Sequence, residues 1–302
     1  MKFNPVLRDY ESYLRITLRL AENTVETYVR EVFRLLSWFE SEGLEPETVS
    51  SDALSAYIVF RDDSIRIFKG GETRPEPGTT ARILSTCRSF FRFLNSERIR
   101  EDNPSLKLER PRQSQKLPQV LSRSDIEEFL ESIPTDEPLG LRDRTLFELI
   151  YSCGLRISEA AGLTMDRVHL DDGLIRVIGK GDKERLVPVG DVAEKWIRRY
   201  LDESRPFLNI KRSDFLFLSR RGSGLSRKGI WKRFHEWTEK ANIESKVHTL
   251  RHTFATHMLK GGADLRIVQE LLGHSDISTT QIYTHLDNQE LKGSHEVFHP
   301  RG

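Results

Sequence analysis

The sequence predicts a mainly α-helical protein of two domains with one small antiparallel β-sheet. Apolar residues recur at helical spacing through most of the 302-residue chain. Two neighbouring runs, GLIRVIGK and ERLVPV, alternate like strands and flank a GKGD turn that predicts a hairpin, and two more strand-like runs are short. A chain of this length is long for one hydrophobic core and sufficient for two.

The N-terminal part, residues 1–100, is expected to be a small helical domain. Its apolar residues follow a helical period in four stretches, which we place at residues 6–18, 23–41, 51–67 and 79–95. Between the last two stretches, the run KGGETRPEPGTT contains glycines and prolines that rule out a continuous helix.

Residues 101–120 are expected to form an extended linker, because prolines stand at positions 104, 111 and 118 and apolar periodicity is weak. The second domain, residues 121–302, begins with two helical runs, SRSDIEEFLESI and LRDRTLFELIYSC. Ser122 or Ser124 is the predicted N-cap of the first run. The strand hairpin follows, and the pattern then returns to helices.

The charge balance limits where nucleic acid could bind. Lysine and arginine number 47 and aspartate and glutamate 46, so the net charge is only +1. A DNA-binding surface must therefore come from local clusters of basic residues, although such clusters also fit ordinary solvated helix faces. The candidates lie in TARILSTCRSFFRF and SRRGSGLSRKGIWKRF, and they are Arg82, Arg88, Arg92, Arg227, Lys228, Lys232 and Arg233.

Other features of the sequence predict a cytoplasmic protein. No apolar run is long enough to span a bilayer, and the opening run MKFNPVLRDY has no apolar leader. The two cysteines, Cys87 and Cys153, lie far apart in helical segments. We therefore expect two buried thiols and no disulfide.

Six side chains in the second domain have the chemistry that attack on a phosphodiester requires. They are Arg156, Lys180, His248, Arg251, His274 and Tyr283. The attack builds negative charge on phosphate oxygens, which the planar fork of arginine binds with two parallel donors. Arg156 and Arg251 are therefore the expected phosphate clamp. His248 precedes Arg251 by three residues in a helical segment, which places both on one face.

Tyr283 is the expected nucleophile, because its phenol can attack phosphorus when an acceptor takes its proton and cations lie nearby. Lys180 lies between two glycines at the hairpin tip, where it could protonate the departing sugar oxygen. His274 remains as a further hydrogen-bond donor to phosphate. Each residue alone also fits an ordinary structural role, and Glu159, for example, offers Arg156 an ion-pair partner at i,i+3.

No metal or cofactor is expected. His248 and His252 have the i,i+4 spacing of zinc ligands on a helix, but HTLRH lacks a glutamate base and contains the positive charge of Arg251. The GKGDK run lacks the GxxxxGK[ST] spacing of a phosphate-binding P-loop, so nucleotide hydrolysis has no basis in the sequence.

In combination, these motifs closely resemble those of the tyrosine recombinases, above all the Xer branch. They read R-x-S-E, G-K-G, H-x-L-R-H-x-F-A-T-H, L-L-G-H-S and S-T-T-Q-I-Y-T-H, in matching order and spacing. The resemblance covers residues 121–300 and extends more weakly through ENTVETYVRE and TTARILSTCRSFFRFL. It places the family's catalytic arginines, lysine, histidines and tyrosine on the six residues named above.

The resemblance implies a SAM-like four-helix DNA-binding domain followed by the catalytic domain. It also implies strand exchange between two DNA duplexes with paired recombination sites, through a 3′-phosphotyrosyl intermediate and a four-way junction, by a homo- or hetero-tetramer. The expected role is resolution of chromosome dimers at a dif-like site during cell division. A second Xer recombinase and a septal DNA translocase are further partners that the resemblance leaves open.

Three alternatives remain at this point. An integrase or invertase of a mobile element would share the chemistry, but an added N-terminal arm-binding domain would then be expected, and this sequence begins with core-binding helices. A non-catalytic architectural protein would lack at least one catalytic group, and all six are present. A type IB topoisomerase would share the nucleophile, but GHSDISTTQIYTH resembles the Xer sequences.

The tail after the tyrosine has few apolar residues to bury, namely Leu286, Leu291, Val297 and Phe298. A short helix with so small an apolar set is marginal alone. The resemblance implies that it packs into a pocket of the neighbouring protomer and couples the active sites.

Overall fold

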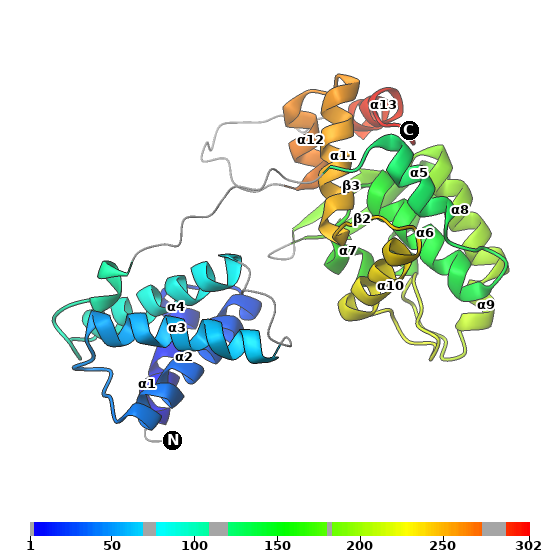
Figure 1. Cartoon of the computed structure of the whole chain (residues 1–302). Coiled ribbons are helices and arrows are strands. Elements are labelled where there is room, and N and C mark those ends of the chain that lie inside the picture. The colour runs from blue at the N-terminus through cyan, green and yellow to red at the C-terminus, as the bar shows by residue number, and fades with distance from the viewer. Residues whose placement is uncertain (1–2, 69–76, 109–119, 180–182, 274–287) are drawn as a thin grey trace. The chain divides into compact units, whose positions relative to one another are not determined.

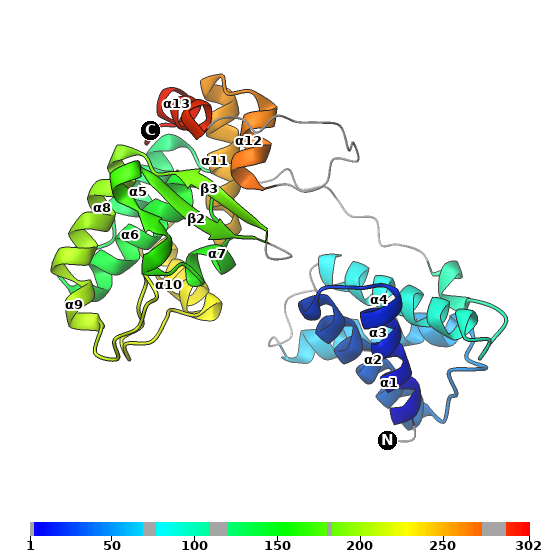
Figure 2. The same ribbon diagram turned by 180° about the vertical axis from the view of Figure 1, so that it is seen from behind.

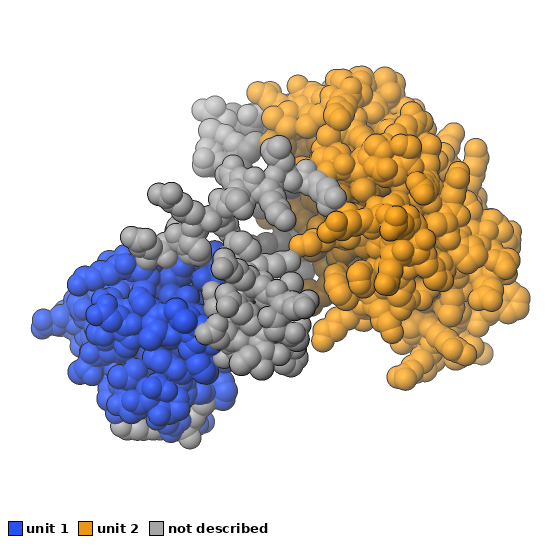
Figure 3. Space-filling model, in the orientation of Figure 1, with its two compact units in different colours: residues 1–115 blue, residues 116–302 orange. Residues whose placement is uncertain are grey.

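A computed structural model describes residues 3–68, 77–108, 120–179, 183–273 and 288–302, apart from the side chains of 62–68, 77–78 and 288–290. The chain divides into two compact units, Met1–Gln115 and Lys116–Gly302. Figures 1 and 2 show the units from opposite sides, and Figure 3 colours them separately. Both are mainly helical, and the second contains one small antiparallel sheet, which confirms the predicted fold class.

The described part of the N-terminal unit contains four α-helices, α1 (Asn4–Ser12), α2 (Glu22–Glu42), α3 (Ser51–Phe68) and α4 (Pro77–Ser96), with a π-helical turn at Tyr13–Thr17. They match the four predicted stretches to within a few residues. Aromatic rings dominate the core of this unit, where Tyr10 and Phe90 meet edge to face at 5.3 Å between ring centroids. The loop at residues 69–76 lies outside the described residues.

The stretch predicted as an extended linker begins as part of this unit. A 3₁₀ turn, Pro104–Lys107, starts at Asn103, whose side chain accepts a hydrogen bond from the Ser105 N–H at 3.1 Å. Leu108 is buried in the same core, and its carbonyl accepts from Arg88 Nη2 at 2.8 Å. The proline at position 104 does not prevent this turn, because proline suits the first turn of a helix. Residues 109–119 are not described.

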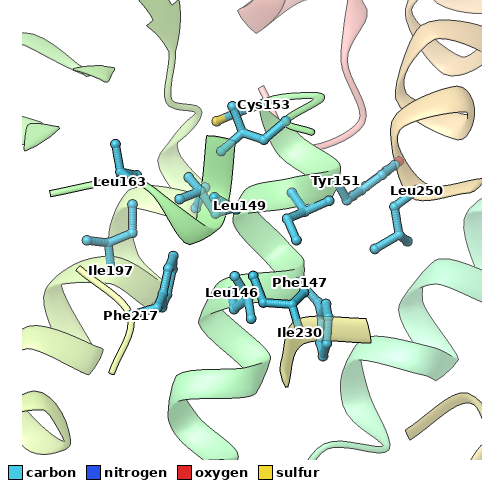
Figure 4. Packing of buried hydrophobic residues seen from close by; sticks show 14 of the residues in the cluster. Leu146, Phe147, Leu149, Tyr151, Cys153, Leu163, Ile197, Phe217, Ile230 and Leu250 are labelled. Carbon is cyan, nitrogen blue, oxygen red and sulfur yellow. The ribbon is translucent and has the colours of Figure 1, made fainter. Parts of the chain in front are cut away.

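The second unit is built around α6 (Pro138–Ser152), which is buried on every side from Gly140 to Ser152. Figure 4 shows its residues Leu146, Phe147 and Leu149 packed in the middle of the core. The other helices of this unit are α5 (Arg123–Glu131), α7 (Ile157–Ala161), α8 (Asp191–Glu203), α9 (Arg205–Leu208), α10 (Arg227–Lys240), α11 (Val247–Gly261), α12 (Leu265–Leu272) and α13 (Asn288–Phe298). Ser122 caps α5 in a capping box with Asp125, as one of the two predicted N-caps.

The predicted hairpin is present as β2 (Leu174–Ile178) and β3 (Glu184–Pro188), paired antiparallel from Leu174↔Pro188 to Ile178↔Glu184. A short strand, β1 (Val168–His169), adds to β2, and the sheet order is β1-β2-β3. Figure 2 shows β2 and β3 side by side. The turn that contains Lys180 lies outside the described residues. The hairpin therefore ends, as far as it is described, at Gly179 on one strand and Lys183 on the other.

Helix α13 lies beside α11 and α12 in both ribbon views. Leu291 joins a small core with residues of these two helices, and His295 is fully buried, with Nε2 at 2.7 Å from the Ser152 carbonyl oxygen. In the single chain the tail therefore packs against its own unit, and its role in coupling neighbouring protomers stays a prediction. Buried histidines supply contact area that an inventory of apolar residues did not include.

The predicted state of the cysteines is confirmed, since Cys87 and Cys153 are both free and buried. None of the described helices is long and apolar enough to cross a membrane.

Candidate active site

Arg156 stands directly before α7 and is tied to Glu159 in the first turn of that helix. The Arg156 backbone N–H donates to Glu159 Oε2 at 2.8 Å, and its Nη1 donates to Oε1 at 2.9 Å. The ion pair expected at this spacing is therefore formed. It does not occupy the whole guanidinium, because 36% of the Arg156 side chain remains exposed while Glu159 is buried.

Arg251 reaches the same place from α11. Its Nη1 donates to the Gly154 carbonyl at 2.6 Å, and its Nη2 donates to the Leu272 carbonyl at 2.5 Å. Burial, assisted by the positive charge of Arg156, lowers the pKa of Arg251 to about 10. The guanidinium therefore stays protonated at neutral pH, but it has lost much of its contact with water.

A glycine makes this approach possible. Gly154 has φ +57°, and a Cβ there would lie 2.6 Å from Phe254 Cδ1. Any larger residue would be strained by the left-handed backbone and would push α11 away. The turn between α6 and α7 therefore brings the Gly154 carbonyl and Arg156 up against α11.

Arg185 on β3 is a third arginine of this site, and sequence reasoning missed it. Its Nη1 and Nη2 donate to Oε1 and Oε2 of Glu159 at 2.8 and 2.9 Å. A signal was available, because the two-residue period of a strand places Arg185 on the same face as the fully buried Val187. An arginine on the core-facing side of a strand requires a buried partner.

Glu159 holds these arginines as a carboxylate. Burial alone would raise the pKa of Glu159, but hydrogen bonds and charge from Arg185 and Arg156 outweigh this and hold the pKa below its ordinary value. Arg251 Nη1 lies 3.8 Å from Glu159 Oε2, close enough for attraction without a hydrogen bond. Three guanidinium groups around one carboxylate leave an excess of positive charge.

The same three arginines bind the C-terminal end of α12. Arg185 Nε donates to the Leu271 carbonyl at 2.9 Å, Arg251 to that of Leu272 at 2.5 Å, and Arg156 Nη2 to that of Gly273 at 3.3 Å. The last carbonyls of a helix lack partners within it and favour cations. Gly273 ends α12 in the left-handed conformation, with φ +62°.

The described residues account for half of the predicted catalytic set. Arg156 and Arg251 lie together at Glu159, and His248 is exposed in the first turn of α11, one turn before Arg251. Lys180, His274 and Tyr283 lie outside the described residues. Two of them directly follow described glycines: Gly179 precedes Lys180, and Gly273 precedes His274.

The predicted DNA-binding residues fall into two groups. Those with exposed side chains are Arg82 and Arg92 on α4 and Arg227, Lys228 and Lys232 on α10. Lys232 also lies 3.8 Å from Glu236, in a solvent-exposed ion pair that water weakens.

The other two candidates are engaged inside the protein. Arg88 donates to the Leu108 carbonyl, and Arg233 Nε donates to the buried Asp143 at 2.6 Å. Both contacts stabilise the fold, and they argue that these two arginines contribute less to any DNA surface than their exposed neighbours.

Comparison with known families and proteins agrees with this geometry. Residues 119–290 match the phage integrase family, and residues 7–98 match the phage integrase N-terminal SAM-like domain. The chain is 40% identical to the tyrosine recombinase XerD of Listeria monocytogenes, over 99% of both chains. It is 42% identical to XerD of Pseudomonas aeruginosa, over 99% of this chain and 98% of that protein.

Solved structures give the same result. XerH recombinase bound to a palindromic difH substrate has a TM-score of 0.64 and 26% identity, and the match covers 89% of this chain and 78% of that chain. A lambda integrase tetramer bound to a Holliday junction has a TM-score of 0.66 at 19% identity, over 92% and 79% of the two chains, and shows the shared fold. The chain therefore belongs to the phage integrase family, and it is a site-specific DNA recombinase of the tyrosine class.

Proposed function

We propose that this enzyme cleaves and rejoins DNA at a dif-like site and thereby resolves chromosome dimers during cell division. The observation that carries the chemical part is the excess of positive charge at Glu159, where Arg156 keeps an exposed guanidinium. The biological part is supported by the full-length similarity to proteins named XerD and by the likeness to XerH on a difH substrate.

Arg156 and Arg251 would bind the non-bridging oxygens of the scissile phosphate. Both now donate to main-chain carbonyls at the end of α12 and in the turn before α7. A phosphate oxygen can take the place of a carbonyl, because arginine binds a charged phosphate oxygen more strongly than a neutral carbonyl oxygen. The arginines would bind the transition state best, since negative charge grows on the oxygens they contact. His248 and His274 would add hydrogen bonds.

Cleavage would follow from attack by Tyr283. Its oxygen forms a bond to phosphorus, the phenol proton passes to a nearby acceptor, and the bond to the 5′ oxygen breaks. Lys180 would give a proton to that oxygen, so that a neutral hydroxyl leaves. The DNA would then be joined to the enzyme through its 3′ phosphate. Attack by the 5′ hydroxyl of another strand reverses the chemistry and completes the exchange.

We also propose that residues 1–100 and 121–302 bind DNA as two domains joined by a linker, with Arg82, Arg92, Arg227 and Lys228 contacting the duplex. Four protomers would act on two paired sites, either four copies of this chain or two copies with two of a second recombinase. A septal DNA translocase is a further partner of this proposal.

One experiment tests the proposed function. The protein is incubated in EDTA with sheared DNA from its own organism, and DNA ends that become covalently attached to protein are sequenced. We expect attached 3′ ends at a single chromosomal site. The Tyr283→Phe variant lacks one oxygen, so it should bind the same DNA and yield no adduct.

Two results would change the proposal. Adducts formed by Tyr283→Phe would show that another residue is the nucleophile. Attached ends at the borders of a mobile element, in place of one chromosomal site, would favour the integrase or invertase alternative. An adduct that forms only after addition of a second recombinase or a purified translocase would establish that partner.

A further inference from the structure

Arg185 is the most fully engaged of the three arginines at the site. All three of its guanidinium nitrogens donate, two to Glu159 at 2.8 and 2.9 Å and one to the Leu271 carbonyl at 2.9 Å. Its side chain is 13% exposed. The parallel pair of bonds to one carboxylate is the strongest arrangement that arginine forms with an anion.

The other two arginines hold Glu159 less tightly. Arg156 forms one side-chain bond to Glu159, and Arg251 forms none, since its Nη1 lies 3.8 Å away. A phosphate would therefore draw Arg156 and Arg251 away from weak or replaceable partners. It would have to break a bidentate ion pair to draw Arg185. Arg185 is thus the arginine expected to keep its contacts when DNA binds.

The contacts of Arg185 lie close to the residue that precedes Lys180. Its strand, β3, is paired to β2 up to Ile178↔Glu184, so Arg185 lies one residue from the last described pair before the Lys180 turn. A Cβ built on Gly179 would lie 3.7 Å from Arg185 Nη1 and 3.8 Å from Glu159 Oε1. The guanidinium and its carboxylate therefore lie beside the backbone of the residue directly before Lys180.

The end of α12 makes an equally close contact. A Cβ built on Gly273 would lie 3.1 Å from Arg185 Cδ, so a side chain there would have little room. Together with the bond to the Leu271 carbonyl, this contact fixes α12 to the hairpin. Arg185 thus joins three segments: the base of the hairpin, the helix turn that holds Arg156, and the end of α12.

We propose that Arg185 is a positioning residue that sets the distance between Lys180 and the phosphate held by Arg156 and Arg251. The inference rests on the proposed function, which gives Lys180 the role of proton donor. Arg185 itself does not touch DNA in this proposal. It keeps the base of the hairpin against Glu159, so that the strand ends on either side of Lys180 stay fixed relative to the phosphate-binding arginines.

The test measures single-turnover cleavage by Arg185→Gln on ordinary DNA and on DNA whose bridging 5′ oxygen is replaced by sulfur. Sulfur leaves without a proton, so a defect that acts through Lys180 should be corrected. A misplaced catalytic group can cost about a hundredfold in rate. We expect a loss of that order on ordinary DNA and recovery to within about tenfold of the wild-type rate on the sulfur substrate.

Three further variants make the result decisive. Lys180→Ala should behave like Arg185→Gln, with a loss on oxygen and recovery on sulfur. Arg185→Lys keeps the charge without the fork and should give an intermediate loss, and it replaces the glutamine variant if that fails to fold. Arg176→Gln is the matched control, because Arg176 lies on β2 in long ion pairs of 3.6 and 3.7 Å with exposed carboxylates, and its cleavage rate should be unchanged.

The possible failures are distinguishable. If Lys180→Ala shows no recovery on sulfur, the proton-donor role fails and the inference fails with it. If Lys180→Ala recovers but Arg185→Gln is equally slow on both substrates, with half-site affinity and melting temperature retained, Arg185 acts elsewhere. Cleavage of ordinary DNA at the wild-type rate by both Arg185 variants would also overturn the inference.

Discussion

Asp143 and Glu159 are both buried carboxylates that gather arginines, yet their surroundings differ. Asp143, on α6, accepts two bonds from Arg142 at 2.6 and 2.9 Å, one from Arg233 at 2.6 Å and one from Trp237 Nε1 at 2.9 Å. Arg142 also donates to the Leu218 carbonyl and is buried. Glu236, paired with Arg233, balances the remaining charge.

The group around Glu159 is not balanced in this way. It has three arginines and one carboxylate, and Arg156 and Arg251 use their other donors on main-chain carbonyls. Both groups are buried at the carboxylate, so burial does not distinguish a structural group from a phosphate site. The difference is uncompensated positive charge on arginines whose partners an anion can replace.

The largest effect should come from the balanced group. Asp143→Asn leaves the buried Arg142 without its ion-pair partner, which typically costs about 3–5 kcal/mol. We expect the free energy of unfolding, from urea denaturation followed by near-UV circular dichroism, to fall by that order. The matched change Glu159→Gln should also lower stability, because it removes the bidentate partner of the mostly buried Arg185, but in addition it should slow cleavage. Cleavage slowed equally in the two variants would contradict the comparison.

The next effect concerns the rate of cleavage. Arg156→Lys and Arg251→Lys keep the charge but lose the fork, so each should lower single-turnover cleavage by about a hundredfold or more. Arg233→Lys makes the same change in the balanced group and should leave cleavage unaltered while lowering the melting temperature. Near-normal cleavage by both site variants would show that charge alone suffices. A loss of DNA affinity in Arg233→Lys would restore its predicted role at the DNA surface.

Much of this organisation could be predicted from local pattern. The helices of the N-terminal unit, the hairpin and the Ser122 cap depend on apolar period, turn residues and capping chemistry, all of which lie within a few residues along the chain. The pairing of Arg156 with Glu159 was visible for the same reason, because one helical turn separates them.

What could not be predicted depends on contacts between distant segments. Arg185 meets Glu159 across 26 positions of sequence, and Arg251 meets the Leu272 carbonyl across 21. No pattern of nearby residues identifies Glu159 as the partner of Arg185 or Leu272 as the partner of Arg251. The packing of the tail within its own unit depends on the buried His295 and His299, which a count of apolar residues leaves out. The 3₁₀ turn at Pro104–Lys107 is held by Leu108, a single buried anchor that has no periodic pattern.

The smallest effect is expected in a third buried cluster, in which His295 and His299 stack at 5.0 Å between ring centroids. It is an effect of pH on stability. Burial lowers the pKa of both histidines below the ordinary 6.5. For His299, the positive charges of neighbouring groups, including His257, Arg301 and Arg123, lower the pKa further. His295 Nδ1 and His299 Nε2 are buried without a hydrogen-bond partner among the described residues, so neither ring gains from a second proton.

The sign of the pH dependence follows from these lowered pKa values. Below about pH 6.5 the released or unfolded tail binds protons that the packed tail excludes, so the packing of α13 should weaken as pH falls from 7.5 to 5.5. Arginines do not titrate in this range and the pKa of Glu159 is held below its ordinary value, so the Glu159 group should be unaffected. Hydrogen–deuterium exchange, corrected for the intrinsic effect of pH, should show faster exchange in residues 291–298 at the lower pH.

His299→Phe removes one titrating ring and keeps the stacking with Phe254 and Tyr151, so it should reduce the pH dependence. An equal response in the variant and the wild type would place the titrating group elsewhere.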